Sequence, residues 1–276
     1  MTVSTFYRLA VFVSITLGAT GAVAQRRAVN PTVLLPTLQA EYALHGDDYL
    51  LLGLRGPVST TSTGGLEQVG LLVGYEHFWN TSWSGGGTLG INTYGQGRLT
   101  GGDAGKLYTD VAPEAFARHW NTFGAFNFRQ RLGLTYLIPG SRGGDSRALT
   151  SLRLDLDRLI PVGNGAVALR PRLAYEATAY LRFQRDEATQ PKERFLDFGY
   201  ARAEVGVRVS NHFDFTPWFG YQSTYVFALA QTNPMGQVTT PAGRLNLVTP
   251  VVGLDARFTL FKGKTVFERR QLPTQH

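Results

Sequence analysis

The chain has 276 residues, a formal net charge of +7 at pH 7 and no cysteine. The missing cysteine excludes disulfides, thiolate metal ligands and a cysteine nucleophile. The basic residues are spread through the chain instead of being clustered, so lipid phosphate or an anionic solute suits the positive charge better than nucleic acid does.

The first 24 residues have the pattern of a secretory signal peptide. Arg8 precedes a short apolar run at residues 9–17, and Ala22-Val23-Ala24 supplies the small residues that a signal peptidase requires. The run is shorter than the roughly 20 residues of a membrane-spanning helix, and no later stretch is continuously apolar over that length. We therefore expect export, with residues 25–36 forming a periplasmic segment ahead of the first strand.

From residue 37 onward, apolar and polar residues alternate, which is the period of a β-strand with two unlike faces. Five strands are predicted in the first half of the chain, at residues 37–55, 65–78, 86–97, 106–118 and 122–138. In the first of them, Asp48 breaks the apolar parity next to Gly46. In the fourth, Pro113 removes a backbone donor.

Five more strands are predicted in the second half, at residues 149–160, 166–184, 195–209, 213–229 and 245–261. Residues 152–157 alternate leucine with a charged residue without exception, and Asn164-Gly165 predicts a tight hairpin turn. Several segments alternate over ten or more residues, whereas strands of globular proteins usually have about 5–6. Such lengths suffice to cross an apolar band of roughly 25 Å at the tilt of a barrel strand.

The connections alternate between short turns and longer polar loops, as they do in outer-membrane barrels. We therefore predict an all-β, antiparallel transmembrane β-barrel of about ten strands at residues 37–261, with eight or twelve strands as alternatives. An even count places both chain ends in the periplasm, including the tail at residues 262–276.

Most arginines take the parity opposite to that of the aliphatic residues. An arginine on the lipid face at the midplane costs roughly 2–4 kcal/mol, so these side chains are predicted to face the lumen. The predicted lumen set, a surface on which a small anionic solute could bind, is Arg129, Arg131, Arg153, Asp155, Arg170, Arg172, Glu176, Arg182, Arg202, Glu204, Arg208, Asp255 and Arg257.

With Asp157 added, this set holds nine arginines and five acids, which predicts a basic lumen. A barrel of eight strands has an interior just filled by side chains, and ten strands lie close to that limit. A largely filled interior is therefore favoured, and a narrow, porin-like passage preferring anions is the other interpretation.

Aromatic residues near the predicted short turns are candidates for the membrane interface, where an amphipathic ring is stable. They are Trp79, Trp83 and Trp120, together with Phe261 at the end of the last strand. The alternative is that they are ordinary turn or core aromatics.

No catalytic residue, metal site or cofactor is predicted. Ser210-Asn211-His212 has residue types found in hydrolases, but it lies on a predicted turn without an acidic partner. Two alternatives to a non-enzymatic envelope protein remain open. One is a membrane enzyme that hydrolyses or transfers acyl chains, and the other is a structural barrel whose outer loops bind a partner.

The last predicted strand contains a glycine followed by alternating apolar residues and a terminal aromatic, from Val252 to Phe261. This segment resembles the C-terminal insertion signal of small outer-membrane β-barrel proteins of Gram-negative bacteria. The resemblance implies an outer-membrane location, contact with outer-membrane lipid and lipopolysaccharide, and recognition by the outer-membrane assembly machinery. It names no particular activity, and the basic tail after Phe261 departs from the usual pattern.

Overall fold

The computed structural model describes residues 26–44, 48–61, 65–66, 68–95, 105–140, 144–162, 167–181, 195–228, 230–233, 235–240 and 242–261. The predicted leader at residues 1–24 and the predicted tail at residues 262–276 lie outside this part of the chain. Within it, all regular secondary structure is β-strand. None of the described residues belongs to a helix long and apolar enough to cross a membrane.

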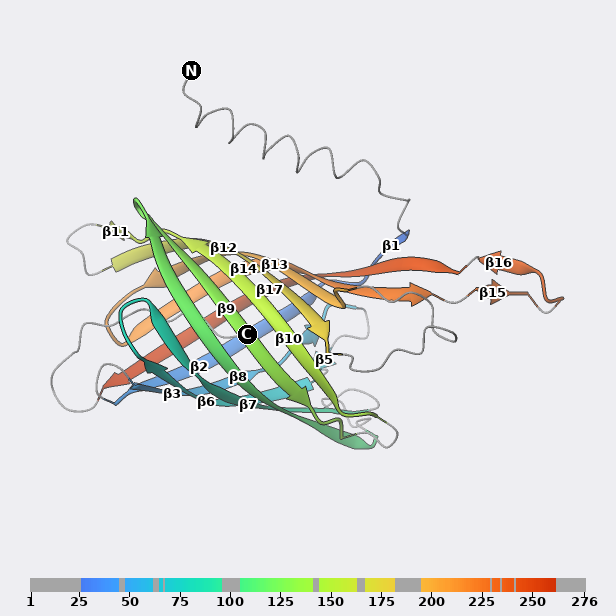
Figure 1. Cartoon of the computed structure of the whole chain (residues 1–276), viewed down its shortest axis with the longest axis horizontal. Helices are drawn as coiled ribbons and strands as arrows, with labels where there is room; N and C mark the ends of the chain where they lie inside the picture. The colour runs from blue at the N-terminus through green and yellow to red at the C-terminus, as the bar shows by residue number, and fades with distance from the viewer. Residues whose placement is uncertain are drawn as a thin grey trace, which may run out of the picture.

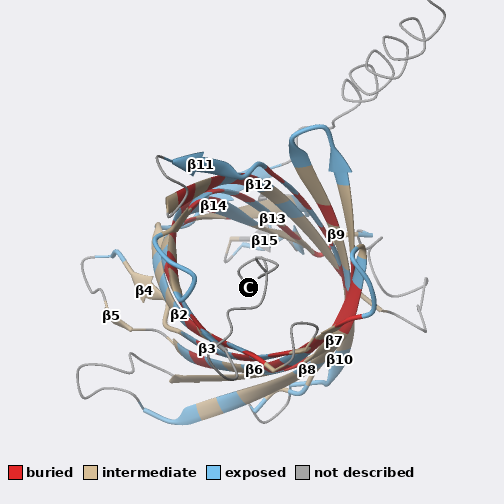
Figure 2. Cartoon of the chain, turned by 90° about the vertical axis from the view of Figure 1, so that its left-hand side faces the viewer, coloured by how far each residue is buried: buried red, intermediate tan, exposed pale blue. Residues whose placement is uncertain are grey.

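Eleven long strands form one closed barrel (Figures 1 and 2). The β-barrel predicted from the alternating pattern is thereby confirmed, and strands that follow one another around the wall from β2 to β17 pair antiparallel. In barrel order the strands are β2 (Val33–Ala43), β3 (Asp48–Arg55), β6 (Gln68–Phe78), β7 (Trp83–Gly95), β8 (Leu107–Phe123), β9 (Phe126–Leu137), β10 (Arg147–Asp157), β12 (Val167–Tyr180), β13 (Phe198–Arg208), β14 (Phe213–Ala228) and β17 (Gly243–Phe261).

The barrel has one strand more than the predicted ten because residues 37–55 form parts of two strands. β2 and β3 pair as a hairpin, and the Leu44 amide donates to the Asp48 carbonyl at 2.9 Å beside the turn. Asp48, which breaks the apolar parity in the sequence, is the first residue of β3. The parity break therefore marked a chain reversal within one predicted strand.

The barrel closes through a parallel pairing of its first and last strands. β17 and β2 run side by side from Val251 opposite Val33 to Phe261 opposite Ala43. An odd number of alternating strands requires this, because the first and last then point the same way. The chain consequently enters and leaves the barrel at opposite ends, whereas the expected even count would have placed both at one end.

The two ends of the barrel differ in their connections. At the short-turn end, on the left in Figure 1, four of the five connections have two to four residues, and the fifth spans residues 158–166. At the opposite, long-loop end, the connections are residues 56–67, 96–106, 138–146, 181–197 and 229–242. The remaining short strands are β1 (Arg26–Val29), β4 (Val58–Ser59), β5 (Gly65–Leu66), β11 (Ile160–Val162), β15 (Gln231–Thr232) and β16 (Val238–Thr240).

The outer face of the barrel is largely apolar, and most charged residues of the strands face inward. Asp48, at the start of β3, is an exception, because it accepts a hydrogen bond from the exposed Tyr75. Leu132, Leu152 and Leu173 on neighbouring strands expose 59%, 47% and 63% of their surface. Arg153, Asp155 and Arg172, which take the opposite parity on the same strands, are buried. This polarity is the inverse of that of a water-soluble domain, where large exposed apolar surfaces are uncommon.

An apolar cluster lies inside the barrel at the short-turn end. It consists of Ala43, Tyr49, Leu51 and Phe78, with Trp120 packed against it. The Phe78 and Trp120 rings are stacked, with centroids 5.3 Å apart. Trp120 shares the inward parity of Arg118, so its position differs from the outward one expected for a membrane-interface aromatic.

The parallel closure can be tested by introducing cysteine pairs, because the chain has none of its own. Leu38 lies opposite Ala256, and Leu34 lies opposite Val252. We expect Leu38→Cys with Ala256→Cys, and separately Leu34→Cys with Val252→Cys, to form disulfides within one chain, detected by mass spectrometry of peptides. In an antiparallel closure that preserved the first pair, Leu34 would face Leu260. Cross-linking of Leu34→Cys to Leu260→Cys in place of Val252→Cys would therefore contradict the closure.

Candidate functional site

The short-turn half of the interior is occupied by paired charges, which we call the charge belt. It contains seven arginines and seven carboxylates, all nearly inaccessible to solvent. The members are Glu41, Glu76, Arg118, Arg129, Arg153, Asp155, Asp157, Arg170, Arg172, Arg202, Glu204, Asp214, Asp255 and Arg257.

Asp157, at the end of β10, is a centre of the belt. It pairs with Arg129 of β9, with Arg170 Nε at 3.2 Å and with Arg172 Nε at 3.9 Å. The Asn127 amide donates to it as well, at 3.0 Å. One carboxylate thus connects three adjacent strands, and its charge is balanced from both sides.

The belt continues across β12, β13 and β17. Arg172 pairs with Glu204 at 2.5 Å, and Glu204 also accepts from Arg202. Arg202 reaches on to Asp255 at 2.6 Å. Trp218 completes this segment, because its indole donates to Asp255 at 2.9 Å and its ring centroid lies 3.9 Å from the Arg202 guanidinium.

Arg257 links the two strands that close the barrel. It pairs with Glu41 of β2 at 3.0 Å and with Asp214 of β14 at 2.8 Å. On β6, β7 and β8, Arg118 pairs with Glu76 at 2.6 Å, and Ser84 donates its hydroxyl to the same carboxylate at 2.6 Å. The belt therefore supports the closure as well as the wall.

The equal numbers of arginines and carboxylates in the belt have a physical reason. An ion removed from water costs several kcal/mol unless an opposite charge and hydrogen bonds compensate it. Glu41, Glu76 and Asp214 provide part of this compensation and were absent from the predicted lumen set. All three alternate with aliphatic or aromatic neighbours, so the parity rule that found the arginines could also have found them.

The structure brings most of the predicted lumen residues together. Nine of the thirteen belong to the belt, and Arg131 and Glu176 line a cavity above it. Arg208 is partly buried near the short-turn end. Arg182 lies outside the described residues.

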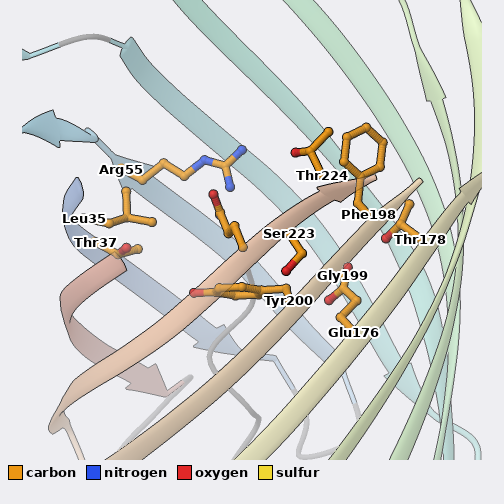
Figure 3. Close-up of a pocket in the computed structure, with 11 residues that line it drawn as sticks. Leu35, Thr37, Arg55, Glu176, Thr178, Phe198, Gly199, Tyr200, Ser223 and Thr224 are labelled. Carbon is orange, nitrogen blue, oxygen red and sulfur yellow. The ribbon is translucent and has the colours of Figure 1, made fainter. Parts of the chain in front are cut away.

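The long-loop half of the interior contains a cavity of about 400 Å³, which we call the vestibule (Figure 3). A second cavity of about 210 Å³ adjoins it and shares Thr37, Arg55, Glu176 and Thr178 with it. The vestibule is lined by Leu35, Thr37, Arg55, Glu176, Thr178, Phe198, Gly199, Tyr200, Gln222, Ser223 and Thr224. Six of these eleven residues carry a hydroxyl or amide side chain, in contrast to the charged residues of the belt.

Of the other aromatic residues predicted at the membrane interface, two lie beside a turn at the short-turn end of the barrel and one has a side chain that the structure does not describe. Trp79 and Trp83 flank the β6–β7 turn and expose 59% and 44% of their surface. Their placement at a membrane interface stays a prediction. The Phe261 side chain lies outside the described part of the chain.

The structure assembles no Ser–His catalytic pair at Ser210-Asn211-His212. The Ser210 hydroxyl oxygen accepts from the amides of His212 and Phe213, both at 3.1 Å, which is a turn-capping arrangement. His212 Nδ1 lies 3.1 Å from the Thr259 carbonyl oxygen. Among the described residues, no group of three or more His, Cys, Asp or Glu side chains is arranged to hold a metal ion.

Comparison of the chain with protein-family models, with curated proteins and with solved structures finds no match.

Removing one belt carboxylate should strongly destabilise the barrel. In Asp157→Asn, three buried arginines lose a shared counter-charge, and breaking a buried pair typically costs about 3–5 kcal/mol. The urea midpoint of the detergent-folded protein should fall by a corresponding amount. Asp145→Asn, at an exposed loop residue, should change stability by less than about 0.5 kcal/mol. Equal midpoints for the two variants would show that the belt does not stabilise the fold.

Proposed function

We propose that this chain is an outer-membrane β-barrel, exported by a cleaved signal peptide, whose interior is largely filled. The observation that carries the proposal is the inverted polarity of a closed barrel: leucines cover the outside, and fourteen ionised groups are buried within. In hydrocarbon, every backbone polar group needs an internal partner, and a closed barrel satisfies this requirement. An apolar exterior would be unfavourable in water and suits contact with acyl chains.

The proposed orientation follows from the connections. Outer-membrane barrels have short turns in the periplasm and longer loops outside, so we assign the short-turn end to the periplasm. The end of β17, with its insertion-signal pattern, then faces the periplasm, where the assembly machinery would bind it. The parallel closure places residues 26–32 at the other end, in place of the periplasmic position expected from an even strand count. The long loops would contact lipopolysaccharide.

The belt argues for a sealed lumen over an open, porin-like passage. Its members belong to nine of the eleven strands and are paired across the wall, which leaves their charges compensated. Such an interior offers a permeating anion few unpaired cations near the short-turn end. A small anionic solute is therefore proposed to bind above the belt without being conducted through it. No described group favours an acyl-transfer or hydrolysis mechanism over this role.

The membrane location predicts an asymmetric response to a charge placed on the outer face. Leu132→Arg puts a guanidinium in the middle of a strand, where lipid contact would cost roughly 2–4 kcal/mol. Leu107→Arg puts the same group at the long-loop end of β8, where the cost should fall to about 0–1 kcal/mol. Folding into phospholipid vesicles, measured by protease protection, should fail or slow only for Leu132→Arg. Equal folding of both variants would contradict a lipid-facing wall.

The sealed lumen predicts electrical silence. Detergent-purified protein should migrate differently before and after boiling, as closed barrels do, and should then produce no discrete conductance in a planar bilayer. Stepwise anion-selective currents that decrease on replacing Arg170 or Arg172 would favour the passage instead. Release of fatty acid from phospholipid would favour the membrane enzyme.

A further inference from the structure

We propose that the vestibule is a binding site for a small organic acid that carries one negative charge and several hydroxyl groups, with Arg55 as the residue that holds the carboxylate. This inference rests on the proposed function, because it assumes a closed barrel whose lumen is blocked by the charge belt. It names the solute class and assigns the anion to Arg55, a residue outside the predicted lumen set.

Arg55 differs from the belt arginines in its partners. Its guanidinium donates to the Asn92 side-chain oxygen at 3.0 Å, and among the described residues it pairs with no carboxylate. A partly buried guanidinium with only an amide partner retains donors and an uncompensated charge. A carboxylate is the group that matches this planar fork, because it accepts two parallel hydrogen bonds.

The wall is shaped to hold Arg55 in this position. Gly70 lies opposite Arg55 on β6, and a Cβ there would come within 2.8 Å of Arg55 Cγ, Arg55 Nε and Asn92 Oδ1. Only a residue without a side chain leaves space for both the arginine stem and its amide partner. Asn92 then fixes one end of the guanidinium, which reduces the freedom lost when an anion binds.

The other charges of the two cavities limit the ligand to one negative charge. Arg131 is paired with Glu114 at 2.8 Å, and Glu176 lies 3.9 Å from Arg153. Of the described residues that line the vestibule, Arg55 is therefore the cation that has no carboxylate partner. A dianion would place its second charge in a cavity that Glu176 also lines, which like-charge repulsion disfavours.

The uncharged lining favours hydroxyl groups on the ligand. Thr37, Thr178, Ser223 and Thr224 present hydroxyls, Gln222 an amide and Tyr200 a phenol, and each of these groups both donates and accepts hydrogen bonds. In Figure 3, Thr37 and Thr178 lie on different sides of the group, with Tyr200, Ser223 and Thr224 between them. The volume of about 400 Å³ lies within the roughly 300–1,000 Å³ range of small-molecule sites.

Calorimetric titration of the detergent-folded barrel tests the inference, with gluconate as the hydroxylated monoanion and glucose as its neutral counterpart. Only protein whose electrophoretic mobility shifts on heating is used in the titration. Protein that does not form a closed barrel is thereby distinguished from a closed barrel that does not bind gluconate. We expect gluconate to bind more tightly than glucose, propionate and the dianion glucarate, and salt to weaken its binding. Equal binding of glucose and gluconate, or no binding of gluconate to heat-shifting protein, would overturn the inference.

Two variants and a control locate the site. Arg55→Gln should weaken gluconate binding on the order of tenfold or more, because a hydrogen bond to a charged group is lost. Arg55→Lys keeps the positive charge but loses the planar guanidinium, so it should bind gluconate with intermediate affinity. If Arg55→Gln does not fold, this second variant still tests the role of Arg55. Arg158→Gln, at an exposed residue of the short-turn end, should bind like the unaltered protein. Unchanged affinity in both Arg55 variants would exclude Arg55 as the anion ligand.

Discussion

Compensation of buried charge is the constraint on which the interior of this barrel depends. An arginine that turns away from an apolar exterior has to be neutralised inside, where little water can solvate it. Asp157 and Glu204 each serve more than one arginine, and Arg257 connects the strands on both sides of β17. The same side chains that keep charge off the outer surface therefore hold neighbouring strands together.

The constraint is relaxed in the long-loop half, where the vestibule takes the place of the charge belt. Small inward residues replace the long side chains there: Gly53, Gly90 and Gly70 are all on the wall near Arg55. Because little volume is filled, a cavity remains, and among the described residues Arg55 on its wall has an amide partner and no carboxylate partner.

Period-two alternation was sufficient to predict the all-β barrel and the inward direction of most arginines, because a pleated strand has only two faces. It failed at residues 37–55, where apolar parity resumes after Asp48 and hides a turn. Arg55 escaped prediction because it ended that supposed strand. The position of its guanidinium depends on Gly70 and Asn92, which come from two other strands.

Trp120 was expected at the membrane interface because it lies near a turn, whereas it shares the parity of Arg118 and packs against the buried apolar cluster. Pairings between distant strands are not encoded in local periodicity.

The parallel seam has a consequence for how the barrel is made. Glu41 and Arg257 are separated by 216 positions in the chain, so the contact that unites β2 and β17 is unavailable until both strands have been synthesised. Until then, both margins of the growing sheet carry unsatisfied amides and carbonyls, the condition in which strands associate with neighbouring molecules. A chaperone or a lipid-embedded template that shields those margins would have to remain in place until the final strand arrives.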